Sequence, residues 1–211
     1  IAGLVKGAHS GEGLGNKFLS HIRETQCFAH VIRCFEDENI IHVEGKVSPI
    51  NDLETIETEL ILADLEVVSK RKESVQKKLR SGDKTTQKEF DILEKIQANL
   101  DSNQPVRKID FDDNDKVFLK QLQLVTSKPF FFIANIHEDE EKNMHLAELE
   151  DYACDHNLEI LKVFAKAEGE LIDLEQEERK EYLEIMGLKE PALNSIIRKG
   201  YEMLDLFSDF T

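Results

Sequence analysis

The sequence has few cysteines, no membrane-length apolar run and no opening signal segment. The three cysteines, Cys27, Cys34 and Cys154, are odd in number and form no metal-type pair, which favours reduced thiols over a disulfide framework. No apolar run approaches the roughly 20 residues that a bilayer span needs, and no basic-then-apolar segment opens the chain. We therefore expect a soluble cytoplasmic protein without a membrane partner.

A phosphate-binding motif and a metal-ligand pattern are missing too. Gly45-Lys46 is followed by Val47, and position 40 is Ile, so the pattern G-x-x-x-x-G-K-[ST] is not met. The histidines show no spacing of the kind that a metal site needs. The sequence itself thus predicts no phosphate cradle and no metal ligand set.

Basic charge is scarce, but it is concentrated in one segment. The formal charge of −16 argues against non-specific binding of nucleic acid, DNA included, by the whole surface. Residues 70–95 nevertheless hold nine Lys and Arg against five Asp and Glu, a local charge of +4. Within this basic island we expect Lys77, Lys78 and Arg80 to contact phosphate-rich surface such as RNA. A solvated helical face is the alternative.

Glycine is concentrated at the beginning of the chain, where five of the ten glycines fall within the first fifteen residues. Glycine permits positive φ and close backbone approach at a cost in conformational entropy. The cluster, followed by helix-like residues 16–22, therefore indicates a mobile loop built around a ligand. A flexible linker is the alternative, but Leu4, Val5 and Leu14 suit a solvated linker poorly.

Helical periodicity begins at about residue 52 and forms two apolar stripes on either side of Ser81-Gly82-Asp83. The first stripe consists of Leu65, Val68, Val75 and Leu79 with Lys72 in an intervening position, and the second of Phe90, Leu93, Ile96 and Leu100. A Gly-containing break between two such helices predicts an antiparallel hairpin that projects from the body and ends at Pro105.

Apolar runs outside the hairpin predict a parallel sheet. The predicted strands are 28–35, 106–111, 129–134 and 159–164, the predicted helices are 115–124 and 144–154, and the chain is mostly helical beyond 169. The β-α-β order brings the ends of the last two strands to one edge of the sheet, where α/β folds bind ligands.

Two glycine-containing runs carry a family resemblance. Residues 2–8 (Ala-Gly-Leu-Val-Lys-Gly-Ala) and 11–19 (Gly-Glu-Gly-Leu-Gly-Asn-Lys-Phe-Leu) resemble the switch II segment of the YchF subfamily of Obg-like P-loop NTPases. Residues 190–201 resemble the family helix before its C-terminal TGS domain, and Phe210-Thr211 resembles the junction, with Asp209 in place of Tyr. The resemblance implies an α/β parallel-sheet G-domain core interrupted by an α-helical coiled-coil hairpin. It also implies truncation at both ends, without the phosphate-binding loop, switch I and the TGS domain.

Two loops after predicted strands resemble the base-recognition loops of P-loop GTPases. They are Asn135-Ile136-His137-Glu138, in the place of Asn-Lys-x-Asp, and Ala165-Lys166-Ala167-Glu168. In the GTPase pattern the Asp carboxylate accepts from guanine N1–H and the 2-amino group, whereas adenine N1 is an acceptor. Glu138 and Ile136 therefore fit a site that has abandoned guanine, and the YchF family carries Asn-x-x-Glu and prefers ATP. The backbone amides of Ala165 and Lys166 remain available to a nucleotide, while a solvated turn is the alternative for Asn-x-x-Glu alone.

The residue after the switch II glycine, Gly3, is Leu4, where many GTPases have a Gln that orients the attacking water. Because Leu4 cannot hydrogen-bond, another group must position the water. The two candidates are His9, in the glycine-rich run, and His42, in an Ile-His-Val-x-Gly motif that the family shares. We favour His42 because its apolar flanks could hold it in place, and a surface imidazole is the alternative for either.

These expectations combine into one hypothesis with two alternatives. Residues 1–55 are expected to form the first part of an Obg-type G domain, 56–105 an inserted helical arm, and 106–211 the second part with the base loops and the helices that follow. The resemblance implies an ATPase switch that uses ATP and Mg²⁺ and associates with ribosomal RNA, although this fragment alone is expected to be inactive. The alternatives are an RNA-binding module whose basic arm is the main activity, and a GTPase.

Overall fold

The computed structural model describes residues 14–37, 47–171 and 174–206. The chain divides into two compact units, which we describe separately: residues 1–26 with 53–129, and residues 27–52 with 130–211. The expected domain boundaries at residues 55 and 105 remain a prediction.

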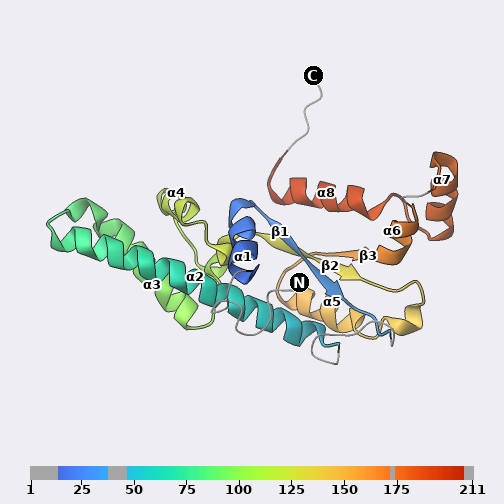
Figure 1. Cartoon of the computed structure of the whole chain (residues 1–211), viewed down its shortest axis with the longest axis horizontal. Helices are drawn as coiled ribbons and strands as arrows, with labels where there is room; N and C mark the ends of the chain where they lie inside the picture. Colours follow the sequence, from blue (N-terminus) through green and yellow to red (C-terminus); the bar gives the residue numbers. More distant parts are fainter. Residues whose placement is uncertain (1–13, 38–46, 172–173, 207–211) are drawn as a thin grey trace, which may run out of the picture. The chain divides into compact units, whose positions relative to one another are not determined.

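The first unit contains a long helical hairpin, formed by α2 (Pro49–Arg80) and α3 (Gln87–Asp101), which run side by side (Figure 1). Gly82 in the turn has a φ of 97°, a conformation that an L side chain rarely adopts. The short 3-10 helix η2 (Lys84–Thr86) leads into α3. The predicted hairpin and its break are confirmed, although α2 begins three residues earlier than expected.

Both predicted stripes of the hairpin are packed inward. Val68, Val75, Leu93, Ile96 and Leu100 are each at most 1% exposed and belong to one apolar cluster. Lys72, which interrupts the first stripe, is paired instead of buried: its Nζ lies 3.2 Å from Glu94 and donates to Gln97 Oε1 at 3.1 Å. The arm therefore has an apolar core of its own.

A fully buried carboxylate holds the base of the arm. Asp64 of α2 is 0% exposed; its Oδ1 accepts from the Val125 N–H at 3.0 Å, and its Oδ2 accepts from the Thr126 N–H at 2.7 Å and from Thr126 Oγ1 at 2.8 Å. Arg23 of α1 (Leu14–Glu24) lies 4.0 Å from Asp64 and donates to the Ala63 carbonyl at 3.2 Å. Burial raises the pKa of Asp64, while these hydrogen bonds and Arg23 oppose the rise. One side chain thus joins α1, α2 and the 3-10 helix η4 (Val125–Ser127).

The predicted strand at 106–111 is wrong. Val106 instead begins the 3-10 helix η3 (Val106–Lys108), and both Val106 and Phe111 are buried in the cluster of the arm. The Val106 N–H donates to Thr126 Oγ1 at 3.2 Å, so a side chain takes the place of a ladder partner. These residues are apolar because they cover the arm. The helix predicted next is confirmed as α4 (Asp113–Leu122), whose N-cap Asp112 accepts from the Asp115 N–H.

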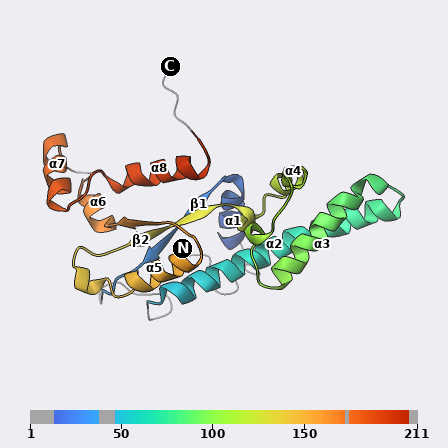
Figure 2. The same cartoon turned by 180° about the vertical axis from the view of Figure 1, so that it is seen from behind.

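The second unit is built on a parallel sheet of three strands in the order β1 (Phe28–Arg33), β2 (Phe130–Asn135) and β3 (Ile160–Val163). The views in Figures 1 and 2 place α5 (Leu146–Asp155) on one face of this sheet and α8 (Ala192–Met203) on the other. Between β3 and α8 lie α6 (Ala165–Leu171) and α7 (Gln176–Ile185), and η5 (Glu140–Lys142) precedes α5.

Alternation along β2 explains the two covered faces of the sheet. Phe131 and Ile133 form a buried cluster with Val163, against which Ile196 of α8 packs. Phe132 faces the other way, with its ring centroid 6.3 Å from that of Tyr152 on α5. A strand buried on both faces needs a continuous apolar run, as β2 has. The predictions of β1, β2, α5 and β3 are confirmed within a few residues.

Candidate nucleotide site

Both predicted base loops lie at the carboxyl edge of the sheet. Asn135 is the last residue of β2, and its carbonyl accepts from the Cys34 N–H at 3.0 Å. The next N–H, that of Ile136, donates to the Val163 carbonyl at the end of β3 at 3.0 Å. The beginning of the first loop is thus tied to both neighbouring strands, which is the juxtaposition that the β-α-β order predicted.

In the first loop a buried apolar side chain is followed, two residues later, by an exposed carboxylate. Ile136 is buried and Glu138 is exposed. Between them, the His137 ring packs 5.7 Å from the ring of Phe35, which follows β1. The predicted site residues Asn135 and Glu138 therefore lie on a backbone that neighbouring elements hold in place.

The second loop is the beginning of α6. Ala165 and Lys166 are its first two residues, both with exposed side chains, and the Phe164 carbonyl accepts from the Glu168 N–H at 2.9 Å. The Glu168 carboxylate in turn accepts from the Ala192 N–H at 2.8 Å, at the start of α8. Glu168 is thus engaged within the fold, whereas Ala165 and Lys166 face solvent.

Tyr182 of α7 has an acidic side chain beside it. Partial desolvation raises the pKa of Tyr182 on α7, and the carboxylates of Glu170 and Glu138 raise it further. The Tyr182 hydroxyl donates to Glu170 Oε2 at 3.0 Å. Tyr182 and Glu170 thus form a hydrogen-bonded pair that the sequence patterns did not reveal.

The residues predicted to act on the phosphates lie outside the described part of the chain. These are Gly3 and Leu4 of the switch II resemblance and the two histidines, His9 and His42. Among the described residues, no group of three or more His, Cys, Asp or Glu side chains could hold a metal ion. No described helix is long and apolar enough to cross a membrane.

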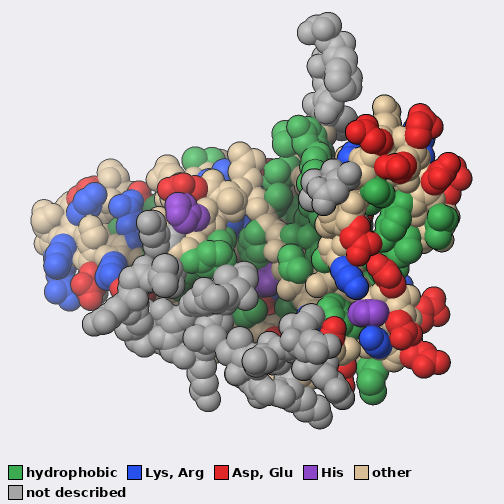
Figure 3. Space-filling model, turned by 45° about the vertical axis from the view of Figure 1, so that its right-hand side comes forward, with side chains coloured by type: hydrophobic (Ala, Val, Ile, Leu, Met, Phe, Trp, Pro, Cys, Tyr) green, Lys and Arg blue, Asp and Glu red, His purple; other side chains and the backbone are tan. Residues whose placement is uncertain are grey.

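The predicted RNA contact residues lie at the end of the arm. Lys77, Lys78 and Arg80 are exposed in the last turn of α2, and Figure 3 shows Lys and Arg side chains gathering there. Other cations of the basic island are engaged within the unit, since Lys88 pairs with Asp115 at 2.6 Å and Lys95 donates to the Asp110 carbonyl at 2.7 Å. The charge available to a partner is therefore concentrated at the tip.

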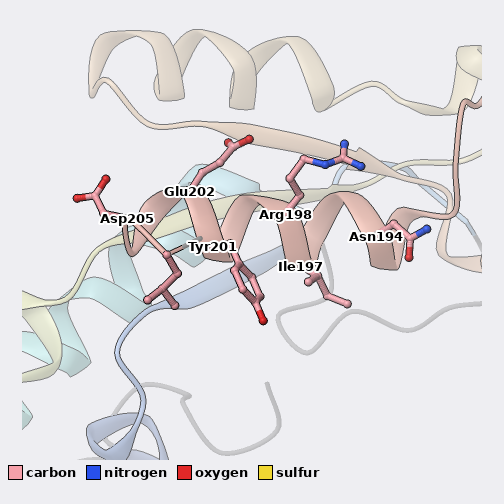
Figure 4. A pocket seen from close by; sticks show the side chains of 7 residues that line it. Asn194, Ile197, Arg198, Tyr201, Glu202 and Asp205 are labelled. Atoms are coloured by element: carbon pink, nitrogen blue, oxygen red, sulfur yellow. The ribbon is translucent and has the colours of Figure 1, made fainter. Parts of the chain in front are cut away.

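Described residues of the second unit line two hollows. One, of about 300 Å³, lies beside β3 and α8 and includes Phe164 and Glu168 in its lining. The other, of about 660 Å³, is an open groove on α8, where Ile197 and Tyr201 point to the same side of the helix (Figure 4). Glu168 of the second predicted loop thus lines the first hollow, whereas Asn135 and Glu138 line neither.

No protein-family model matches the chain, but curated proteins match all of it. It is 46% identical over 215 residues to the ribosome-binding ATPase YchF of Bacillus subtilis, covering 100% of this chain and 59% of that protein. The Escherichia coli O157:H7 protein of the same name is 45% identical over 212 residues, covering 100% of this chain and 58% of that protein. The sequence belongs to the YchF family. It spans somewhat less than two thirds of the length of these relatives.

A solved structure agrees with this membership. The Schizosaccharomyces pombe YchF GTPase superposes with a TM-score of 0.78 at 33% identity, covering 96% of this chain and 56% of that one. The expected mixed α/β fold with its helical hairpin is confirmed by this YchF structure together with the sheet described above. The names of these relatives nevertheless differ in the nucleotide, since the bacterial proteins are named ATPases and the yeast protein a GTPase.

Sequence reasoning missed one polar residue that contacts the first loop. Asn143 hydrogen-bonds the backbone of His137, but its position in the run Glu-Glu-Lys-Asn-Met carries no motif. A side chain that bonds only to backbone leaves no partner residue in the sequence to reveal it.

Proposed function

We propose that this protein is a ribosome-associated switch of the YchF family that binds ATP and hydrolyses it to ADP and phosphate in the cytoplasm. The observation that carries the proposal is the placement of Asn135-x-x-Glu138 and Ala165-Lys166 at one carboxyl edge of a parallel sheet. The names of the bacterial relatives, ribosome-binding ATPase, support it.

Base selection follows from the chemistry of Glu138. A carboxylate accepts hydrogen bonds and donates none when ionised, so it suits the N1–H and 2-amino donors of guanine when held against that edge. Glu138 is one methylene longer than the Asp of the guanine pattern, and Ile136 is packed inward. We infer that the longer side chain weakens the guanine-specific hydrogen bonds and that the loss of the Lys stem changes the cover of the base, so that adenine is accepted. GTP remains the alternative substrate.

Phosphoryl transfer needs positioning and neutralisation of charge, which Mg²⁺ supplies when it is bound with ATP. In the chain itself we assign water positioning to His42, with His9 as the alternative, because Leu4 cannot hydrogen-bond. These 211 residues contain no G-x-x-x-x-G-K-[ST] motif, so by themselves they should turn ATP over at a negligible rate.

Hydrolysis tests this function in the full-length protein, meaning this sequence within its complete reading frame. ATP should be hydrolysed with a higher kcat/KM than GTP, and excess GTP should compete poorly. His42→Ala should lower ribosome-stimulated kcat with little change in ATP affinity, which is the result expected for a group acting in the transition state, and His9→Ala is the matched control. A faster reaction with GTP would contradict the assignment of ATP.

A second candidate function is supported by the exposed cations at the arm tip. In that version the arm is an RNA-docking module and nucleotide turnover is secondary. Salt-dependent RNA binding that ignores the nucleotide would favour the module, whereas binding that changes between ATP and ADP would favour the switch.

A further inference from the structure

The Asn143 side chain is paired with both backbone groups of the central loop residue. Its Oδ1 accepts from the His137 N–H at 2.7 Å, and its Nδ2 donates to the His137 carbonyl at 2.8 Å. The two bonds require opposite ends of the amide, so the backbone of His137 dictates which way the amide points. An aspartate could make only the first bond, and an alanine could make neither.

A second clamp lies on the far side of Glu138. The Asp139 N–H donates to His137 Nδ1 at 3.0 Å, and the same imidazole packs against Phe35. Glu138 therefore lies between His137 and Asp139, whose backbones are both held by hydrogen bonds, while its own side chain is exposed. The direction in which its carboxylate leaves the loop is set by its neighbours.

Asn143 is itself anchored to the body of the unit. Its N–H donates to the Glu140 carbonyl at 3.0 Å, and its carbonyl accepts from the Leu146 N–H, the first residue of α5, at 3.2 Å. Cys34, whose N–H donates to the Asn135 carbonyl, is bound to the same segment, because its own carbonyl accepts from the His145 N–H at 3.2 Å. A rigid helix start is thus connected, through one amide, to the loop that carries the carboxylate.

We propose that Asn143 is a positioning residue that sets the adenine-over-guanine preference of the base loop by fixing the direction of Glu138. The inference rests on the proposed function, because it assumes that this loop borders the base and that its fixed geometry keeps the Glu138 carboxylate off the N1–H and 2-amino donors of guanine. Hydrogen-bond readout depends on distances within a few tenths of an ångström, so a loop released from Asn143 would keep its carboxylate but lose discrimination. If Asn143 merely stabilised the loop, its replacement would weaken the binding of ADP and of GDP equally.

The test is a set of fluorescent ADP and GDP titrations on the full-length protein, with the ratio of the two Kd values as the readout. Asn143→Ala should bring the ratio at least fivefold closer to 1, and Asn143→Asp should have an intermediate effect. Asn194→Ala, an exposed asparagine on α8, is the matched control and should leave the ratio unchanged. Thermal melts of each variant verify that the titrated protein is folded.

A double-variant cycle separates positioning from general damage. If Asn143 acts through Glu138, Asn143→Ala should change the ratio no further in a Glu138→Ala background. Hydrogen exchange gives a readout without nucleotide: the His137 amide should exchange faster in Asn143→Ala and stay protected in Asn143→Asp.

Three results would overturn the proposal. Equal weakening of ADP and GDP by Asn143→Ala would assign it a structural role only, and an additive change in the double variant would remove the dependence on Glu138. A wild-type protein that binds ADP and GDP equally would overturn the proposed ATP preference and this inference with it, which distinguishes that failure from the first two.

Discussion

The two units hold their important residues in different ways. In the first, the arm is fixed by a closed apolar cluster and by a fully buried carboxylate, Asp64. In the second, the loop that carries Glu138 is fixed at an exposed edge by hydrogen bonds to the backbone, chiefly from Asn143. Substitutions in the first unit should therefore lower stability, while substitutions at the loop should alter nucleotide recognition.

The largest expected effect is loss of an apolar side chain from the arm. Leu93 is 0% exposed in the arm cluster, so Leu93→Ala should lower the free energy of unfolding by about 3 kcal/mol, as transfer and cavity terms combine. Leu193→Ala, at a side chain 62% exposed on α8, is the matched control and should change it by less than about 0.5 kcal/mol. Urea denaturation measures both; similar losses would show that the arm has no core of its own.

Next in size is the buried carboxylate. Asp64→Asn keeps one acceptor but turns an N–H toward the Thr126 N–H, leaving buried donors unpaired at a cost of about 2 to 3 kcal/mol. Glu73→Gln, an exposed position on the same helix, should be nearly neutral. A melting temperature of Asp64→Asn equal to that of wild type would refute the role given to this junction.

A smaller effect should appear at alkaline pH in the second unit. Burial, aided by Glu150, raises the pKa of Cys34 from 9.0 to about 11. Between these values the folded state keeps a proton that the unfolded state releases, so stability should fall as pH rises, by about 2 kcal/mol over the window. Cys34→Ala should have a flatter stability profile between pH 9 and 11. An unchanged slope would show that the Cys34 thiol is not the cause.

Substitutions at the arm tip should have almost no effect on stability and a clear effect on the binding of ribosomes or RNA. Replacing Lys77, Lys78 and Arg80 with Glu changes only exposed side chains, so the free energy of unfolding should shift by less than about 1 kcal/mol. Ribosome or RNA association should weaken about tenfold or more, with a shallower salt dependence. Co-sedimentation that matches wild type across salt concentrations would remove the tip as a contact surface.

Periodicity predicted the elements whose cores are local in the sequence. Heptad spacing identified the hairpin, and the run Phe130–Ile133 identified β2, because a strand buried on both faces must be apolar throughout. The β-α-β order also placed Asn135 beside the end of β3. These features depend on residues within one element or its immediate neighbours.

Features that depend on distant partners could not be predicted. Val106 looked like a strand residue because its apolar character serves the arm cluster. No sequence pattern marks Asp64, because its partner Thr126 lies 62 residues away along the chain. Asn143 bonds only to backbone, which no residue pattern records. Each of these three residues makes its tertiary contact through one side chain, which leaves no pattern in the sequence around it.

Nucleotide preference is best decided by titrating fluorescent ADP and GDP against the full-length protein, with and without the double substitution Ile136→Lys with Glu138→Asp. Wild type should bind ADP at least as tightly as GDP, and the double variant should shift the preference toward GDP. Tighter binding of GDP by wild type, by tenfold or about 1.4 kcal/mol, would rule out the assignment of ATP to this loop.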